Sequence, residues 1–129
     1  MSDIQVGDSA TLEFQVGEDD TAAALGSGDV PVLATPRAVA WLEAAACSAV
    51  AESLADGETT VGITVSVDHS VATPVGVTVV ATALVAEVDR RRAMFDVALV
   101  NPDGTTAMSG VVQRVVVDRA EFLASLPPV

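Results

Sequence analysis

Apolar and polar residues alternate in five stretches of the chain, and a period of two is typical of a half-buried β-strand. The five stretches are TLEFQV at residues 11–16 and the segments at about 61–72, 77–89, 93–100 and 105–118. Between the last four stretches, TPVG at 73–76 has the composition of a turn, and RRR at 90–92 and NPDG at 101–104 are predicted to be hairpin turns. Because short turns favour pairing between consecutive strands, these four strands are predicted to form an antiparallel meander.

One long helix is predicted between the first and second strands, in TPRAVAWLEAAACSAVAESLADG. Thr35 suits the N-cap, Pro36 the first helical position and Gly57 the C-terminal stop. The segment before this helix, EDDTAAALGSGDVPVLA, is predicted to be a loop, and the terminal DRAEFLASL a short helix capped by Asp118.

These elements predict an α+β fold in a single domain, residues 1–129. A long central helix packs against a five-stranded antiparallel sheet, and a short helix ends the chain. A chain of 129 residues is long enough for one hydrophobic core, and no internal repeat, low-complexity tract or linker interrupts it.

The composition favours a soluble cytoplasmic protein. Half of the residues are hydrophobic but only 3% are aromatic, so the core is expected to consist of Val, Ala, Leu and Ile. Glu43 interrupts the most apolar helical stretch, and the acidic N-terminal sequence has none of the features of a signal peptide. The single cysteine, Cys47, cannot form an internal disulfide and is expected to be a small buried residue.

The charge limits the classes of partner. The net charge is −12, and all six basic residues are arginine. A field of this sign repels nucleic acid and anionic membrane surfaces, so neither is an expected partner. An anionic small ligand needs a local cluster of arginines.

Glu43 is a polar residue in an apolar part of the helix. At 100° per residue it groups with Val39, Ala46 and Val50 (and with Ala40 and Cys47), whereas Glu52 lies on the other side. An unpaired buried carboxylate costs several kcal/mol, so Glu43 needs a partner or a raised pKa. A structural hydrogen bond to a buried backbone N–H is the alternative interpretation.

His69, the only histidine, lies in a strand of small apolar residues. A period of two places it on the same face as Ile63, Val65 and Val67, which is the face against which the helix packs. A lone histidine on such a face is usually an ordinary core residue. Two misplaced polar groups on facing surfaces, His69 and Glu43, are more easily explained if they meet, either directly or across a dimer.

Thr35 is the third candidate. Its hydroxyl lies at the start of the helix, beside free backbone N–H groups and the positive end of the helix dipole. Glu43 is eight residues further on, about 12 Å along the axis, which leaves room for an imidazole between the two. A hydroxyl, an imidazole and a carboxylate together are the groups that acyl transfer requires.

The order of the strands around the long helix resembles the hot-dog fold. TPRAVAWLEAAA together with VGITVSVDHSVATPVG resembles the fluoroacetyl-CoA thioesterase group of that fold. This group has a threonine, a helical glutamate eight residues later and a strand histidine in the context V-x-H-x-x-A-T-P-x-G. Here Thr35, Glu43 and His69 occupy those positions. Gly62 matches a glycine seven residues before the histidine, and Arg114 in VVQRVVV matches an arginine on the last strand.

The resemblance covers residues 30–118 and implies an acyl-CoA thioesterase. It implies catalytic roles for Thr35, Glu43 and His69, and a place for Gly62 and Arg114 among the substrate-binding residues. It also implies a homodimer, or a higher oligomer, whose sites lie near the dimer interface. No metal and no cofactor is expected, because the CoA moiety is part of the substrate.

Arg90, Arg91 and Arg92 are the only basic cluster in this acidic chain. Arginine side chains bind phosphate well, so the cluster is a candidate site for the phosphates of CoA. A solvated hairpin turn is the alternative interpretation.

Two other functions stay open. The chain could form a dimer that binds an acyl ligand without turnover, or a hot-dog hydratase or dehydratase. The second is less favoured, because Asp68 beside His69 is predicted to point to the opposite face of the strand. For thioester hydrolysis, His69 is the expected general base, Glu43 orients it, and Thr35 is either the nucleophile or a positioning donor.

Overall fold

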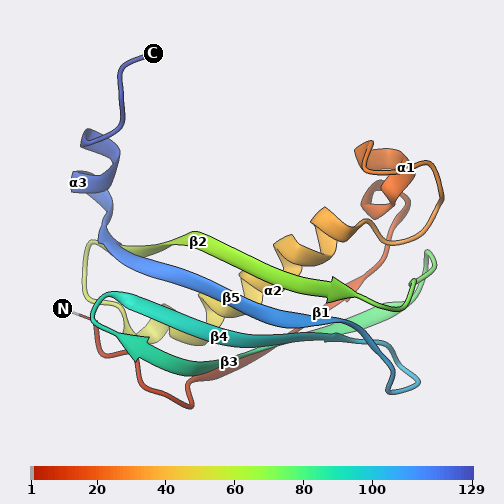
Figure 1. The fold of residues 1–129 in the computed structure, drawn as a ribbon, viewed down its shortest axis with the longest axis horizontal. Coiled ribbons are helices and arrows are strands. Elements are labelled where there is room, and N and C mark those ends of the chain that lie inside the picture. Colours follow the sequence, from red (N-terminus) through yellow and green to blue (C-terminus); the bar gives the residue numbers. More distant parts are fainter. Residues whose placement is uncertain (1) are drawn as a thin grey trace.

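A computed structural model describes residues 2–129 and shows a sheet with one long helix (Figure 1). The strands are β1 (Ser9–Gln15), β2 (Glu58–His69), β3 (Thr78–Asp89), β4 (Arg92–Val100) and β5 (Thr106–Asp118). The helices are α1 (Ala22–Leu25), α2 (Thr35–Val50) and α3 (Arg119–Ala124), with 3-10 turns η1 (Glu18–Asp20) and η2 (Ala51–Ser53). The segment predicted as a loop thus contains η1 and α1, which the sequence prediction missed.

The sheet has five antiparallel strands in the order β1-β3-β4-β5-β2. The class and the strand count agree with the prediction, but the four-strand meander does not. Only β3, β4 and β5 form one, because β2 pairs with β5 and not with β3. The connection between β2 and β3 is not a tight hairpin, since Pro74 within it pairs with Val32. β2 is therefore an edge strand.

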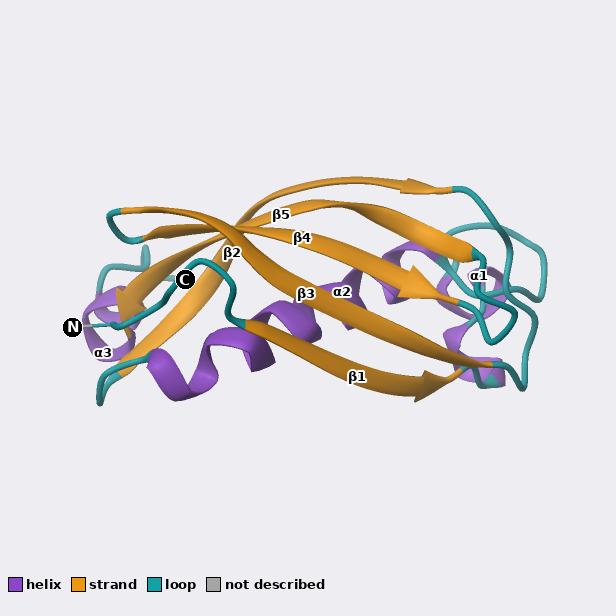
Figure 2. Ribbon diagram, turned by 90° about the horizontal axis from the view of Figure 1, so that it is seen from below, coloured by secondary structure: helices purple, strands orange, loops and turns teal. Residues whose placement is uncertain are grey.

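Helix α2 crosses one face of the sheet (Figure 2) and lies mainly against β3 and β1. Its buried residues pack with the alternate residues of the strands that face it. These helix residues are Ala38, Leu42, Ala45, Ala46 and Val50. Because α2 runs toward the β1 side, it leaves the same face of β2 largely uncovered, and Val65 there is 40% exposed.

The helix boundaries differ from the prediction. The N-cap is Ala34, with extended backbone, and Thr35 is already helical, so the hydroxyl of Thr35 does not cap the helix. At the other end α2 stops at Val50 and tightens into η2. Gly57 does not end the helix; its positive φ of 81° belongs to the turn that enters β2. Asp118 does cap α3, where its carboxylate accepts a hydrogen bond from the N–H of Glu121.

A β-bulge in β2 changes which residues share a face. The register against β5 shifts between Gly62 and Thr64, because Gly62 pairs with Arg114 and Thr64 with Gln113. One extra residue, Ile63, is inserted there. Strict alternation would place Gly62 and His69 on opposite faces. The bulge places both on the face that looks toward α2.

Candidate functional site

Thr35 and His69 meet at one end of the sheet. Thr35 opens α2 and His69 ends β2, and the Thr35 hydroxyl lies 2.7 Å from Nδ1 of His69. The histidine pairs with buried Met108 of β5, so it faces the helix side as predicted. Since Ala34 is the N-cap, the Thr35 hydroxyl is available for this contact.

The other ring nitrogen of His69 has a different environment. Nε2 is buried and has no hydrogen-bond partner among residues 2–129. Burial of the ring lowers the pKa of His69 below its ordinary value, because the charged imidazolium loses hydration there. A neutral imidazole beside a hydroxyl is the state that a general base needs.

Glu43 has an arginine as its partner. Nη1 of Arg114 donates a hydrogen bond of 2.8 Å to Oε2 of Glu43. Arg114 is 8% exposed and is fixed from behind by Thr60, whose hydroxyl and carbonyl accept bonds of 2.9 and 3.0 Å. Thr60 was not anticipated from the sequence, because it carries no sign of function apart from its place on this face of β2. The Glu43 side chain is 30% exposed, so the carboxylate is fixed but open to solvent.

Gly62 lies directly against this ion pair. A Cβ at position 62 would be 2.6 Å from Oε2 of Glu43 and 3.2 Å from Nη1 of Arg114. The absence of a side chain there gives the carboxylate its place. Gly62, Glu43 and Arg114 thus form one cluster, although the sequence assigned the glycine and the arginine to substrate binding.

One chain brings together two pairs of residues, and does not join all three of the predicted catalytic residues. Thr35 contacts His69, and Glu43 contacts Arg114, but no hydrogen bond joins Glu43 to His69 among residues 2–129. Glu43 lies about 12 Å from Thr35 along the helix axis. A single chain therefore contains two separate halves of the predicted constellation, both on the open face near β2.

The buried face of α2 differs in part from the predicted one. Glu43 is half-buried and Glu52 is exposed, which agrees with the prediction. Cys47 and Ala40 were grouped with the buried stripe, but both are exposed. The buried stripe faces β1 and β3, and Glu43 lies at its border. In a single chain, Ala40, Glu43 and Cys47 thus form an uncovered strip of the helix.

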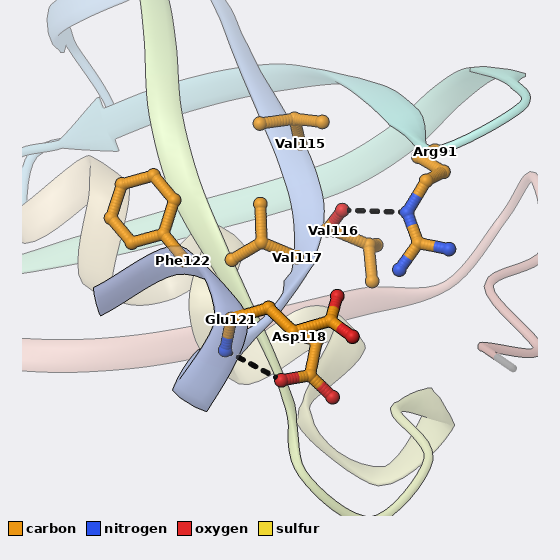
Figure 3. Close-up of a pocket in the computed structure, with 7 residues that line it drawn as sticks. All are labelled: Arg91, Val115, Val116, Val117, Asp118, Glu121 and Phe122. Carbon is orange, nitrogen blue, oxygen red and sulfur yellow. Dashed lines mark hydrogen bonds between the residues drawn. The ribbon is translucent and has the colours of Figure 1, made fainter. Parts of the chain in front are cut away.

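The arginine cluster lies at the other end of the sheet, in the turn between β3 and β4 (Figure 1). Arg90 has a φ of 58°, a left-handed conformation that costs about 1 kcal/mol for a residue other than glycine. A hollow of about 450 Å³ is lined by Asp89, Arg90, Arg91, Arg92 and Val115. An adjoining hollow of about 470 Å³ continues along β5 to Phe122 of α3 (Figure 3). Neither contains Thr35 or His69.

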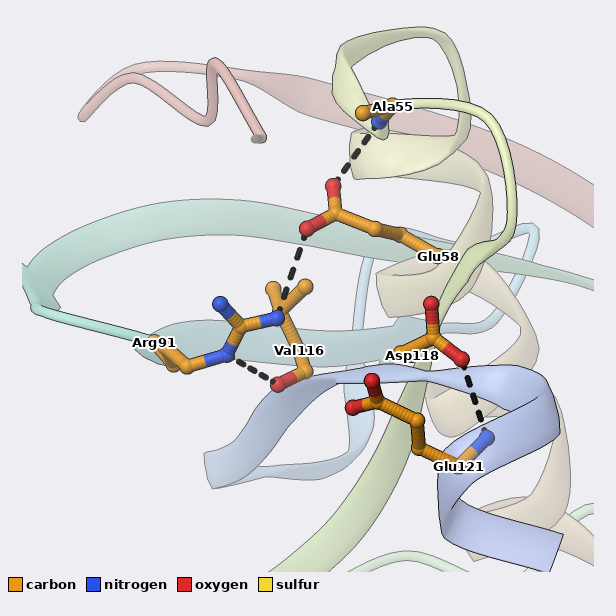
Figure 4. A network of polar contacts seen from close by, with 6 residues as sticks. All are labelled: Ala55, Glu58, Arg91, Val116, Asp118 and Glu121. Carbon is orange, nitrogen blue, oxygen red and sulfur yellow. Dashed lines mark hydrogen bonds and ion pairs between the residues drawn. The ribbon is translucent and has the colours of Figure 1, made fainter.

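Arg91 is partly occupied by contacts within the chain (Figure 4). Its Nε donates to the carbonyl of Val116 at 2.9 Å, and its Nη2 lies 3.4 Å from Oε2 of Glu58. The other oxygen of Glu58 accepts the N–H of Ala55. Arg91 thus ties the turn to β5 and to the start of β2. Arg90 and Arg92 form no ion pair within residues 2–129.

The model of the family FlK, described as fluoroacetyl-CoA-specific thioesterase, matches residues 16–120. The solved structure of the fluoroacetyl-CoA thioesterase FlK is 30% identical, with a TM-score of 0.88 over 97% of this chain and 99% of that chain. A mutant of FlK in complex with fluoroacetate is 31% identical, with a TM-score of 0.86 over 94% and 95%.

The Thermus thermophilus hypothetical protein TTHA0967, a thioesterase superfamily member, is 26% identical, with a TM-score of 0.89 over 96% of this chain and 91% of that chain. A hot-dog-like protein from Thermanaerovibrio acidaminovorans is 21% identical, with a TM-score of 0.83 over 92% and 87%, and supports the hot-dog fold alone. A comparison with curated proteins gave no significant match. None of the helices in residues 2–129 has the length and apolar character needed to cross a membrane.

Proposed function

We propose that this chain, a hot-dog thioester hydrolase that belongs to the FlK family of fluoroacetyl-CoA-specific thioesterases, hydrolyses an acyl-CoA in a site built by two protomers. The observation that carries this proposal is the separation of the two pairs. Thr35–His69 and Glu43–Arg114 are each preassembled, but at different points along β2. A second copy supplies the half that each site lacks.

The edge strand β2 is the surface on which the second copy would dock. Residues from Gly62 to Ser66 are exposed, and Ile63 and Val65 have 42% and 40% of their surface free. An uncapped apolar edge is a template for pairing with another strand. Antiparallel pairing of β2 with its copy would give a closed twofold dimer with one continuous sheet.

The bulge selects a register for this pairing. Residues directly opposite each other in an antiparallel pair point to the same face. With the twofold axis at Ser66, Val65 would face the partner's Val67, and His69 would face the partner's Ile63, the bulge residue next to the partner's Gly62. The partner's Glu43 lies against that glycine. Its carboxylate would therefore approach the Thr35–His69 pair from across the dimer.

In this site His69 acts as the general base. Two roles for Thr35 fit its contact with Nδ1: a nucleophile that transfers its proton to the ring, or a donor that positions a water or the thioester carbonyl. The partner's Glu43 stabilises the imidazolium that forms when the ring takes the proton. Arg114 and Thr60 keep that carboxylate in place, which lowers the reorganisation needed during the reaction.

The arginine turn is assigned to the phosphates of CoA. Within one chain this turn lies at the end of the sheet opposite to Thr35 and His69. Antiparallel pairing of two copies reverses the partner, so the partner's turn would come to the same end as this chain's Thr35–His69 pair. Arg90 and Arg92 have no ion-pair partner among residues 2–129, and their charge locally offsets the net charge of −12.

The hydratase alternative loses its support in the geometry. Asp68 pairs with exposed Ser109 and is itself exposed, on the face opposite to His69. An acid–base pair of Asp68 and His69 on one substrate is therefore not available. A binding module without turnover is the remaining alternative. Hydrolysis of any thioester would exclude it, and a lack of hydrolysis would favour it.

The test has two parts. Release of free thiol is measured over a panel of short, long and aromatic acyl-CoA substrates, and hydrolysis of at least one is expected. His69→Ala and Glu43→Gln, each inactive alone, are then co-expressed with different tags. In a shared site, half of the dimers are mixed and each of these has one intact site, so about a quarter of the wild-type activity returns.

The possible results distinguish thioester hydrolysis from the sharing of the site between two protomers. If no thioester is hydrolysed, the chain is a binding module. If thioesters are hydrolysed but the mixed dimers isolated by both tags are inactive, the site belongs to one chain and the shared site is wrong. A Ser66→Cys variant in a Cys47→Ala background checks the register, because cysteines at the twofold axis are close enough to form a disulfide. A cysteine at Thr59, far from the axis, is the control and should stay reduced.

A further inference from the structure

Thr73 is a fully buried polar residue that no step of the proposed mechanism uses. Its exposed fraction is 0%, and it belongs to the sequence VDHSVATPVG that contains His69. The Thr73 hydroxyl donates a hydrogen bond of 2.8 Å to Oδ1 of Asn101, at the start of the turn between β4 and β5. The side chain therefore ties the β2–β3 connection to a different part of the sheet.

The backbone of the same residue holds the segment that leads into α2. The carbonyl of Thr73 accepts a hydrogen bond of 2.9 Å from the N–H of Leu33, and the adjacent Pro74 pairs with Val32. Leu33 lies two residues before Thr35. The start of α2 is thus fastened to the β2–β3 connection just ahead of the Thr35 hydroxyl.

His69 lies four residues before Thr73 on the other side of this junction. Between them, the N–H groups of Ser70 and Val71 both donate to the carbonyl of Ala107 on β5. The connection leaves β2 along β5 and then turns inward to Thr73. Thr73 thus lies between the end of β2, with His69, and the start of α2, with Thr35.

We propose that Thr73 is a positioning residue, which fixes the Thr35 hydroxyl against Nδ1 of His69 by joining the β2–β3 connection, the start of α2 and Asn101. The inference rests on the proposed thioesterase function of that pair. Asn101 is itself restrained, since its Nδ2 donates to the Thr105 hydroxyl at 3.2 Å, and that hydroxyl donates to Asp103 at 2.7 Å. The junction therefore has a fixed support.

Two substitutions at this position separate shape from hydrogen bonding. Thr73→Val keeps the volume and removes the hydroxyl, which leaves Oδ1 of partly buried Asn101 without its donor. Thr73→Ser keeps the hydroxyl and loses one methyl group. Thr82→Val is the control, because the hydroxyl of half-buried Thr82 likewise makes one hydrogen bond, of 3.4 Å to the carbonyl of Ala98, in the middle of β3.

The first readout is kinetic. Thr73→Val is expected to lower kcat by about 10- to 100-fold with KM nearly unchanged, because a small displacement of the pair affects the chemical step more than binding. Thr73→Ser should restore most of kcat, and Thr82→Val should resemble the wild type. All variants are assayed well below their Tm, so that unfolding does not contribute.

The second readout does not need a substrate. His69 is the only histidine, so one imidazole signal in an NMR titration reports its pKa. In Thr73→Val the loosened junction admits water to the ring, and the pKa of His69 should rise toward its ordinary value. This measurement tests the positioning role of Thr73 even if no thioester is hydrolysed. A wild-type kcat and imidazole titration in Thr73→Val, or equal changes in Thr82→Val, would overturn the proposal.

Discussion

The Thr35 hydroxyl and Nδ1 of His69 lie 2.7 Å apart, although 34 residues of chain separate them. One residue opens the long helix and the other ends the edge strand, so the contact forms only when the helix has packed on the sheet. The opposite nitrogen of the same ring is buried without a partner among residues 2–129. Burial of the ring lowers the pKa of His69 and so favours the neutral form, with Nδ1 directed at one hydroxyl.

Replacement of His69 tests its role as the general base. His69→Ala should lower kcat by about 10²- to 10⁴-fold, the usual contribution of base catalysis, while the fold is retained. An assay of thiol release measures kcat, and circular dichroism of the same samples checks that the fold is retained. A fully active His69→Ala protein would mean that the ring is only a buried side chain.

The stability of the protein should depend on His69 in acid. Burial lowers the pKa of His69, so below the ordinary value the unfolded chain takes up a proton that the folded chain resists. The free energy of unfolding should therefore be unaffected by this residue at higher pH. It should fall as the pH decreases from the ordinary pKa to the folded one. Urea titrations of wild type and His69→Gln at pH 7.5 and 5 measure this free energy. Both proteins contain the same carboxylates, so their contribution cancels when the two free energies are subtracted. A pH-independent difference would contradict it.

Gly62 should be needed for full activity, because the carboxylate of Glu43 lies directly against it. In Gly62→Ala the new Cβ would lie 2.6 Å from Oε2 of Glu43, so Glu43 has to leave its place against Arg114. A loss of about 10- to 100-fold in kcat is expected. Gly17→Ala is the control, since a Cβ there has an ordinary contact of 3.4 Å with Asp20. Equal kinetics of Gly62→Ala and wild type would show that the position of Glu43 is unimportant.

The arginine turn can be tested without breaking its contacts. Arg90→Gly fits the left-handed backbone, and Arg92→Ser removes the second free charge, whereas Arg91 stays because it binds Val116 and Glu58. The double variant should raise KM for an acyl-CoA by roughly tenfold, the effect of two exposed charge contacts. KM for the matching pantetheine thioester, which has no nucleotide, should not change. The same change for both substrates would exclude phosphate binding.

Gly110 should be critical for the stability of the sheet. A Cβ at this position of β5 would lie 2.0 Å from the carbonyl oxygen of Ser66 and 2.7 Å from Cα of Val67, both backbone atoms of β2. Gly110→Ala should therefore force the two strands apart and lower the free energy of unfolding by at least about 2 kcal/mol. Ser109→Ala, at the exposed neighbouring position, should change it by less than about 0.5 kcal/mol. Chemical denaturation of both variants measures the difference.

The sequence alone determined most of the elements and proposed most of the candidate site residues. The period of hydrophobic residues gave five strands and one long helix, and placed His69 on the helix side of its strand. Those are local properties, because side-chain direction in a strand or helix follows from backbone geometry. The joint spacing of Thr35, Glu43 and His69 gave the family. The cost of burying a carboxylate required either a partner for Glu43 or a raised pKa, and it did not identify the partner as Arg114.

Only the tertiary structure decided how these residues meet. It paired β2 with β5, where adjacency in sequence predicted β3, because strand order depends on long-range packing and not on turn residues. The bulge at Gly62 brought that glycine to the face of His69, which strict alternation forbids. Ala34 took the N-cap and freed the Thr35 hydroxyl. The course of α2 toward β1 left Cys47 exposed and separated Glu43 from His69, since a helix and a twisted sheet settle at the angle that buries most apolar surface.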